Sequence, residues 1–244
     1  FKKNKIFNSA SDGGSDYGAV YLTGSKTNSI DSNIITNSGR SGIHLKSSST
    51  DNNISSNVVS LSYYSGLIIK SSDRTEVWNN TFSSSGDNGI KVSSSKNVII
   101  NDNELSSNTD YGLYVSNSRW ITVKNNEDIS DNNVGMYISN SDDGKFKNNT
   151  IENHVSYGVY FTESKRLILS GTEITESLGD ALYLSSNCDE AFVHNNTIKD
   201  NGKTPMIIVS GIALIGILLA TPALNKLKED KTTNVIKPGA ESEE

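Results

Sequence analysis

Hydrophobic residues recur along this chain in short alternating runs that are separated by polar turns. One run is Gly-Leu-Tyr-Val from Gly112, followed by Ser118 and by a second apolar run that ends at Val123. Equivalents of this glycine recur every 23 or 24 residues, at Gly18, Gly42, Gly66, Gly89, Gly135, Gly158 and Ala181. Self-similarity at a fixed period of this length is the sequence signature of a solenoid.

A second motif in each period is an apolar residue, an Asn three positions later, and an apolar residue two positions after that. It occurs at Ile30/Asn33/Ile35, Ile54/Asn57/Val59, Val77/Asn80/Phe82, Ile100/Asn103/Leu105, Phe146/Asn149/Ile151 and Val193/Asn196/Ile198. Thr172 takes the Asn place in one period, and fewer hydrogen bonds between coils are expected there. Another period places its second apolar residue late, at Ile129, which predicts a local bulge or slip. Residues 7–17 predict a longer loop.

The period-2 alternation predicts short β-strands, and the polar residues between the runs leave no room for a helix of useful length. Strands joined by tight turns at this period predict an all-β fold, a parallel β-helix of about eight coils over residues 1–202. Equal positions then form columns along the stack. One column is Asn33, Asn57, Asn80, Asn103, Asn126 and Asn149, and another, at an inward corner, is Ser48, Ser72, Ser95, Ser118, Ser141 and Ser164.

These motifs resemble the repeats of pectin-lyase-like proteins, a group that includes NosD and carbohydrate-binding and sugar-hydrolase modules. The resemblance covers residues 1–202 and implies a right-handed β-helix. It is specific for the fold but weak for function, because this fold hosts lyases, hydrolases, adhesins and binding rods. The stretch from Val98 to Leu105 also fits a leucine-rich repeat, although Ile and Val replace most of the expected Leu.

The composition changes abruptly after Gly202. Residues 206–224 contain no charged side chain, and as a helix they would cover the hydrocarbon thickness of a bilayer. We therefore expect a linker at 203–205, a membrane-spanning helix at 206–224 and a disordered charged tail at 225–244. More Lys residues follow the span than precede it, which predicts a cytoplasmic tail and an extracellular or periplasmic rod. The alternative is a helix that caps the β-helix.

Charge and composition exclude few function classes. The net charge is −6, and acidic and basic residues are mixed along the chain, so no nucleic-acid partner is expected. The single cysteine, Cys188, cannot form an intramolecular disulfide. Because the chain begins within a repeat, at Phe1, Asn4 and Ile6, we expect the gene product to extend further towards the N-terminus.

A search for catalytic groups finds no complete set. Asp110, Asp142 and Asp143 resemble fragments of polygalacturonase motifs, but their offsets place them on different parts of the circumference, where they cannot flank one glycosidic bond. His44, His154 and His194 have unlike offsets and are interpreted as solvated surface residues that form no metal site. No catalytic residue, cofactor or metal is predicted. Possible glycosylation acceptors are Asn53, Asn79, Asn148 and Asn195.

The outward position two residues after each glycine carries the strongest candidate for function. It reads Val20, His44, Ile68, Lys91, Tyr114, Tyr137, Tyr160 and Tyr183. The last four coils therefore stack four tyrosines on one face, where they either stabilise the sheet or bind sugars. We predict a membrane-anchored surface rod that binds glycans or cell-surface proteins. The alternatives are a carbohydrate-active enzyme whose catalytic groups lie in a missing N-terminal part, and a NosD-like factor for metal insertion.

Overall fold

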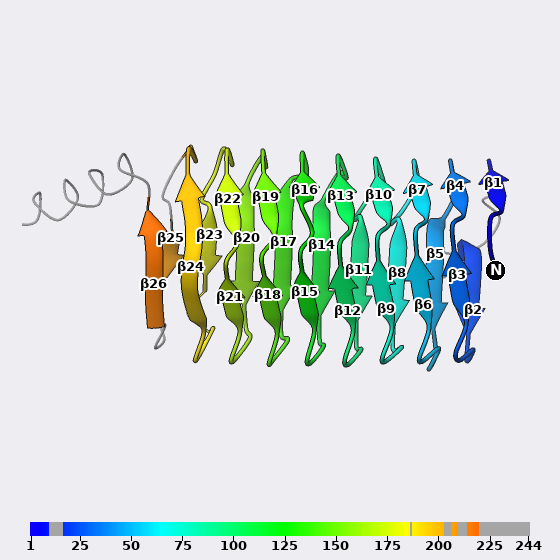
Figure 1. Cartoon of the computed structure of the whole chain (residues 1–244), viewed down its shortest axis with the longest axis horizontal. Helices are drawn as coiled ribbons and strands as arrows, with labels where there is room; N and C mark the ends of the chain where they lie inside the picture. The colour runs from blue at the N-terminus through cyan, green and yellow to red at the C-terminus, as the bar shows by residue number, and fades with distance from the viewer. Residues whose placement is uncertain (10–16, 186, 203–205, 209–213, 220–244) are drawn as a thin grey trace, which may run out of the picture.

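The computed structural model of this chain describes residues 1–9, 17–185, 187–202, 206–208 and 214–219. They form a rod in which each coil lies directly on the previous one (Figure 1). The rod has about eight turns, its paired strands are parallel, and no helix occurs among the described residues. The prediction of an all-β parallel β-helix is therefore confirmed, and the leucine-rich-repeat alternative is wrong.

Each complete coil contributes one strand to each of three faces. Face 1 consists of β3 (Ser29–Asp31), β6 (Asn53–Ser55), β9 (Glu76–Trp78), β12 (Ile99–Asn101), β15 (Thr122–Lys124), β18 (Lys145–Lys147) and β21 (Ile168–Ser170). Face 2 consists of β1 (Lys5–Phe7), β4 (Ile34–Thr36), β7 (Val58–Ser60), β10 (Thr81–Ser83), β13 (Glu104–Ser106), β16 (Asp128–Ser130), β19 (Thr150–Glu152) and β22 (Glu173–Thr175).

The long strand β24 (Phe192–Lys199) joins faces 1 and 2, because it pairs with β21 through its first half and with β22 through its second. Face 3 is a separate nine-stranded sheet. Its strands are β2 (Gly18–Thr23), β5 (Ser41–Lys46), β8 (Leu67–Lys70), β11 (Ile90–Ser93), β14 (Tyr111–Ser116), β17 (Val134–Ser139), β20 (Tyr157–Thr162), β23 (Leu182–Leu184) and β25 (Met206–Ile208).

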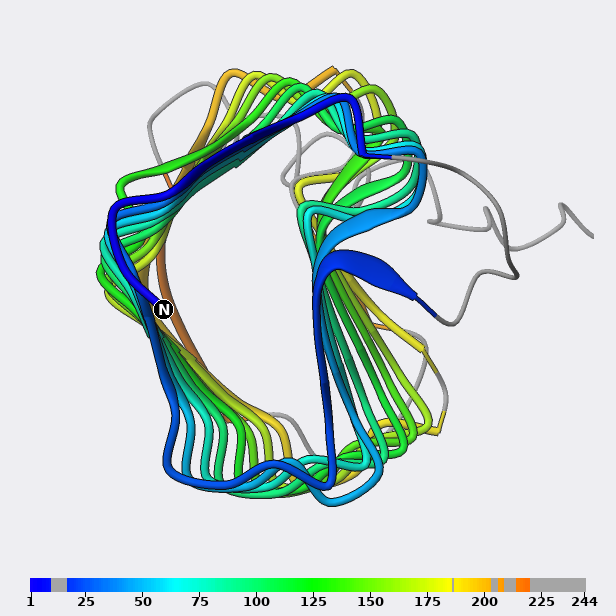
Figure 2. The same ribbon diagram turned by 90° about the vertical axis from the view of Figure 1, so that its right-hand side faces the viewer.

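Face 3 is bent inward. Figure 2 looks along the rod and shows the coils superimposed in one outline that is indented along this face. In β14 the bend places two successive residues, Gly112 and Leu113, towards the interior, between the half-buried Tyr111 and Tyr114. A Cβ atom on Gly112 would lie 2.9 Å from the carbonyl oxygen of Gly135 in the next coil. The glycine is therefore required by the close approach of the next backbone.

The interior of the rod is filled by the apolar residues of the alternating runs. Leu113, Val115 and Val123, which belong to these runs, are fully buried. The largest side chains of the interior are three phenylalanines, Phe82, Phe146 and Phe161. Burial of these side chains drives the coils together, at about 25 cal/mol for each Å² of apolar surface.

The predicted Asn column is confirmed as a continuous hydrogen-bonded stack. In the case of Asn103, Oδ1 accepts the backbone N–H of Asn80 at 3.0 Å, and Nδ2 donates to the Val77 carbonyl at 3.0 Å. Thr172 continues the column with one long bond, in which its Oγ1 accepts the Asn149 N–H at 3.4 Å. The threonine therefore makes fewer bonds between coils, as expected.

The Ser column is confirmed from Ser72 onwards but is shifted by one residue in an earlier coil. There the inward corner is occupied by Ser49, whose Oγ accepts the Ser25 N–H at 3.2 Å. The predicted member, Ser48, is exposed with a φ of 64°. Ser47 also adopts a left-handed φ, of 55°. The 24-residue coil therefore holds its extra residue in this turn, which the spacing alone did not reveal.

The other predicted irregularity lies in the coil that contains Ile129. This residue is in register with Leu105 and Ile151, while Glu127 is exposed in the turn before β16. The local slip is confirmed as one extra residue outside the strand. The loop expected at residues 7–17 connects β1 to β2, and its residues 10–16 lie outside the described part of the chain.

The segment predicted as a membrane-spanning helix contains strands where the structure describes it. Met206–Ile208 form β25, which pairs with β23 on face 3. Leu214–Leu219 form β26, which pairs with β24. Among the described residues there is no helix of the length and apolarity needed to cross a membrane. The predicted helix is therefore wrong for these two stretches.

The physical reason is that the last coil of a β-helix leaves its strand edges open, and an apolar segment can cover them as well as it can enter a bilayer. Hydropathy alone does not separate these two uses. The rest of the predicted span, the linker at 203–205 and the tail at 225–244 lie outside the described residues.

Candidate functional site

The four tyrosines predicted to stack do so on face 3. Tyr114, Tyr137, Tyr160 and Tyr183 are register partners on adjacent strands, and we call them the tyrosine row. Their successive ring centroids are 5.5, 5.1 and 4.6 Å apart, and their planes lie within 17° of parallel. Offset stacking of this kind stabilises each pair by about 0.5–1.5 kcal/mol beyond the burial of area.

Two further tyrosines flank the row across the bend of face 3. The ring of Tyr111 lies 5.1 Å from that of Tyr137, and the ring of Tyr157 lies 5.1 Å from that of Tyr160. All six rings are half-buried. Sequence analysis missed these two residues, although each directly precedes the glycine of its coil. Together the six rings form the aromatic surface in the indentation of face 3.

The geometry of the row decides which groups it offers to a ligand. Each ring face lies against its neighbour, and the Lys91 ammonium lies 5.2 Å from the Tyr114 centroid at the end of the row. Ring edges and hydroxyl groups therefore remain for contacts with a ligand. Partial burial, and then the neighbouring tyrosines, raise the pKa of Tyr111 and Tyr160, which keeps their hydroxyls protonated at neutral pH.

The first coil does not follow the predicted offset. Val20 is in register with the core residue Ile43, and it is Tyr21 that pairs with His44 at the outward position. Val20 is only 9% exposed. The prediction of Val20 as an outward residue is therefore wrong. The cause is that Gly18 pairs with Ser41, so the glycine frame is one residue out of step with the strand register in this coil.

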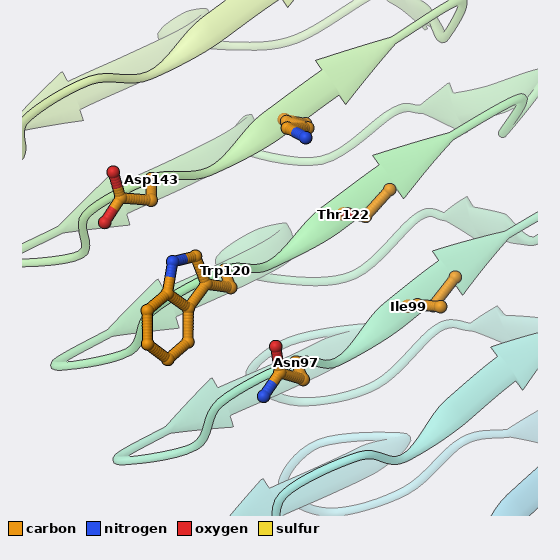
Figure 3. Close-up of a pocket in the computed structure, with 6 residues that line it drawn as sticks. Asn97, Ile99, Trp120, Thr122 and Asp143 are labelled. Atoms are coloured by element: carbon orange, nitrogen blue, oxygen red, sulfur yellow. The ribbon is translucent and has the colours of Figure 1, made fainter.

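A shallow groove crosses face 1, on another side of the rod. Its first hollow has a volume of about 480 Å³ and is lined by Asn97, Ile99, Trp120, Thr122, Asp143 and Lys145 (Figure 3). A second hollow of about 530 Å³ shares Asn97 and Ile99 and continues to Asp51 and Arg74. The two hollows therefore run across successive coils, from the turn before β6 to β18. Sequence analysis did not identify this groove.

Trp120 is the exposed aromatic residue of the groove. Its side chain is 45% exposed, and the Arg119 guanidinium lies 4.5 Å from its centroid. Figure 3 shows the indole between Asn97 of the preceding coil and Asp143 of the following coil. Its φ is 55°, a left-handed conformation that costs about 1–2 kcal/mol for an L-residue. Asn and Asp tolerate this conformation better than a bulky residue does, so Trp120 is an unfavourable choice for the turn itself.

The other coils place smaller or charged residues at the same turn. All of them have a positive φ, and they are Thr27, Asp51, Arg74, Asn97, Asp143, Arg166 and Glu190. Several form ion pairs between coils: Arg74 binds Asp51 at 2.6 Å, and Arg166 binds Asp143 at 2.6 Å. Trp120 interrupts this polar column. An aromatic residue in a column of Asp, Asn and Arg is the signal that could have revealed the groove from the sequence.

The three candidate catalytic acids are held apart. Asp110 lies in the turn before face 3, whereas Asp142 and Asp143 lie in the turn before β18. Asp143 accepts hydrogen bonds from both Arg166 and Arg119, each at 2.6 Å, and these bonds lower its pKa to about 2. A carboxylate held in this way stays ionised and paired, so it is not suited to donate or abstract a proton.

A small pocket of about 150 Å³ on face 3 lies next to the tyrosine row and is lined by His44, Asp87 and Lys91 among others. Burial, and then the neighbouring Asp110, raise the pKa of the Asp87 carboxyl. Asp87 is the single carboxylate among the described residues that line this pocket. Glycoside hydrolysis ordinarily uses two, so the pocket gives no positive sign of catalysis.

Two of the three histidines are buried, against the prediction of surface positions. His44 and His154 are each 1% exposed, while His194 is half-buried. His154 lies in a second polar column, where its Nδ1 accepts the Asn132 N–H at 3.2 Å and its Nε2–H donates to the Ile129 carbonyl at 3.0 Å. Burial lowers its pKa to about 4. For His154 the error arose because a period-based offset does not distinguish an inward corner from an outward one. His44 does lie at the outward position, but the Tyr21 ring packs against it with the centroids 5.6 Å apart.

The remaining candidates fall on ordinary surface turns or in the core. The acceptor residues Asn79 and Asn148 are exposed in turns directly before the Asn column, Asn195 is exposed within β24, and Asn53 is half-buried. Cys188 is a buried free thiol, and burial raises its pKa. Within the described part of the chain, no group of three or more His, Cys, Asp and Glu residues is placed to hold a metal ion.

Comparisons with solved structures agree with the fold. A mutant of the periplasmic alginate epimerase AlgG matches with a TM-score of 0.71 at 16% identity, covering 79% of this chain and 50% of that chain. The A-module of the Azotobacter vinelandii mannuronan C-5 epimerase AlgE6 matches with a TM-score of 0.56 at 18% identity, covering 80% and 56%. The Dettilon tailspike protein matches with a TM-score of 0.55 at 11% identity, covering 81% and 54%.

This chain thus spans about half the length of these three proteins. No curated protein is a significant match to the sequence. Two family models match it, that of the right-handed β-helix region over residues 1–141 and that of the periplasmic copper-binding protein NosD over residues 83–211. Each match covers more than half of the chain. The chain belongs to the right-handed β-helix and NosD families.

Proposed function

We propose that this chain is a polysaccharide-binding rod that works outside the cytoplasm. The observation that carries this proposal is Trp120, the aromatic residue of a polar column, whose indole is 45% exposed in a groove across several coils. The apolar faces of sugar rings pack well against aromatic side chains. A groove that continues over adjacent coils fits an extended polymer better than a small molecule.

The tyrosine row is the second candidate contact surface. Tyr114, Tyr137, Tyr160 and Tyr183 use their ring faces to stack on one another, so a glycan would meet their hydroxyls and ring edges. The spacing of the rings repeats along the rod, as the hydroxyls of a linear polysaccharide repeat along its chain. Contact through hydrogen bonds alone is weaker than contact that also covers a ring.

Three of the comparisons support a place outside the cytoplasm or a polysaccharide ligand. NosD and AlgG are described as periplasmic, and the two epimerases are named for alginate and mannuronan. The likeness in sequence is low, so the site on this chain is argued from its own residues. Binding by the rod itself also agrees with the separation of the candidate catalytic acids.

The copper named in the NosD description does not fit the residues described here. His154 has both ring nitrogens bonded to backbone groups. His44 lies on face 3, whereas His194 lies in β24. No cluster of metal-ligating side chains joins them within the described residues. We therefore assign no step of the function to a bound metal.

The test is binding of the purified protein to a glycan array, and then to each glycan that binds in solution, with three variants. Trp120→Ala should abolish or strongly weaken binding. The same change at Trp78, which is also exposed on face 1, should leave binding unchanged. If the double variant Tyr137→Ala/Tyr160→Ala retains all of the binding, the tyrosine row is not a contact surface. Absence of binding to any polysaccharide by the native protein would refute the proposed function.

A further inference from the structure

Three lysines lie together on face 1 beside Trp120. Lys124 on β15 and Lys147 on β18 are register partners. Lys145 lies two residues before Lys147 on the same outward side of β18, where Phe146 between them is buried. Lys145 also lines the groove itself. We call these three residues the lysine patch.

The lysine patch carries unbalanced charge. In the part of the chain that the structure describes, none of the three ammonium groups has a carboxylate within ion-pair distance. Like charges that face each other on neighbouring strands are destabilising. The carboxylate that lines the groove beside Lys145, that of Asp143, already forms ion pairs with Arg119 and Arg166, both at 2.6 Å.

Three other lysines of the rod are paired with an acid of an adjacent coil. The pairs are Lys2–Asp31 at 3.2 Å, Lys165–Asp189 at 3.4 Å and Lys199–Glu173 at 2.7 Å. The chain as a whole has a net charge of −6. Single lysines elsewhere among the described residues, such as Lys26 and Lys96, also lack an ion pair, but at the patch three like charges lie together on neighbouring strands next to the groove.

We propose that the groove selects an anionic polysaccharide, with a sugar ring against Trp120 and its carboxylate or sulfate groups on Lys124, Lys145 and Lys147. This inference rests on the proposed function and adds the chemical class of the ligand. The two observations are independent, because the exposed indole indicates a ring and the clustered lysines indicate a negative charge. Arg119, fixed by Asp143 and the indole, extends the positive surface across the turn.

The length of the groove favours a polymer. The hollows at Trp120 and at Arg74 adjoin through Asn97 and Ile99, so a bound chain would follow the rod axis across face 1. Arg74 is paired with Asp51 at 2.6 Å, which leaves the positive charge concentrated at the Lys145 end. We therefore expect one end of the groove to hold most of the charged groups of the ligand.

The experiment is calorimetric titration of the whole chain with an oligogalacturonate, the fully methyl-esterified form of the same oligosaccharide, and a single-stranded oligothymidylate of equal charge. The test variant is Lys124→Gln/Lys145→Gln/Lys147→Gln. The control is Lys3→Gln/Lys5→Gln/Lys26→Gln, which removes the same charge from exposed lysines of the first coils. Thermal melting of both variants shows whether they are folded. A sulfated dextran oligomer distinguishes sulfate from carboxylate as the favoured group.

The expected result is that the native protein binds the acidic oligosaccharide at least tenfold more tightly than its ester, and that the patch variant loses roughly tenfold in affinity while the control does not. Rising salt should weaken the binding of the acidic form alone. Equal affinity for the ester would overturn this inference and leave the proposed function intact. Tighter binding of oligothymidylate through the same lysines would overturn both.

Discussion

The tyrosine row and Trp120 place aromatic rings on two faces of one rod by opposite means. The row repeats one residue type at one offset in four successive coils, so each ring is covered by its neighbours. Trp120 stands alone in a column of polar residues and is 45% exposed in a groove. In this rod, a side chain that repeats in successive coils packs against its own copies. A side chain that departs from its column keeps its surface open to a ligand.

The first prediction breaks the tyrosine row. Tyr137→Ala with Tyr160→Ala removes all three stacked contacts of the row. At about 0.5–1.5 kcal/mol for each contact, plus the lost burial, the free energy of unfolding should fall by roughly 3–5 kcal/mol. Denaturation in guanidinium chloride measures the loss. The matched Tyr137→Phe/Tyr160→Phe variant keeps the stacking and should stay near the native stability, and an equal fall in both variants would contradict the stacking argument.

The second prediction concerns the pH dependence of stability, which arises in the interior of the rod and not at either aromatic surface. The pKa of His154 is lowered to about 4 by burial, below the value of about 6.5 in an unfolded chain. The unfolded state therefore takes up the proton first as the pH falls. The contribution of neutral His154 to the free energy of unfolding is fully present above pH 6.5. It should decrease by about 3 kcal/mol on acidification towards pH 4.

His154→Asn tests this directly, since Asn108 and Asn132 occupy the same column in earlier coils. The variant should keep the hydrogen bonds of the column and lose most of the pH dependence between 6.5 and 4. Urea denaturation at several pH values measures both proteins. An unchanged pH dependence in the variant would show that another group is responsible.

The third prediction concerns Trp120 and has the opposite sign to the first. Trp120→Asn places a residue that tolerates a left-handed φ in the strained turn, so the protein should gain about 1 kcal/mol of stability. Trp78→Asn is the matched control, because Trp78 is 41% exposed on a regular strand of the same face and donates from Nε1 to Asn53 Oδ1 at 3.1 Å. The control should lose stability. Thermal melting of both variants decides, and a clear loss for Trp120→Asn would mean that the indole supports the fold.

The smallest expected effect concerns the lysine patch. Lys124→Glu converts the facing pair Lys124/Lys147 into an opposite-charge pair, which should stabilise the protein by about 0.5 kcal/mol at low salt and less at high salt. Melting curves at two ionic strengths measure the change. The same substitution should weaken the binding of an acidic oligosaccharide. A gain in stability together with unchanged binding would separate the patch from the ligand.

Most of the fold could be predicted from the sequence because a solenoid repeats its local rules. The Asn column, the core positions and the slip at Ile129 followed from offsets alone. Offsets failed at Val20 and Ser48, where an extra turn residue or a shifted glycine frame changed the register within one coil. Hydropathy failed at Met206–Ile208 and Leu214–Leu219, because an apolar segment suits both a membrane span and the last coil of a rod.

Of the two candidate contact surfaces, only the tyrosine row could be predicted from the sequence. The tyrosine row was visible because it repeats, but the coverage of its ring faces depends on side-chain packing. The groove was missed because its members come from different offsets: Trp120 from a turn, and Thr122 and Lys145 from the strands beside it. Searching each column for the residue that departs from it would have found Trp120.

The central claim is that Trp120 is retained for a ligand at the expense of the fold. Calorimetric titration of an oligogalacturonate into Trp120→Asn, beside Trp78→Asn, tests it most directly. The account predicts that Trp120→Asn is folded and has lost the binding, while Trp78→Asn binds as the native protein does. Undiminished binding by folded Trp120→Asn would contradict it.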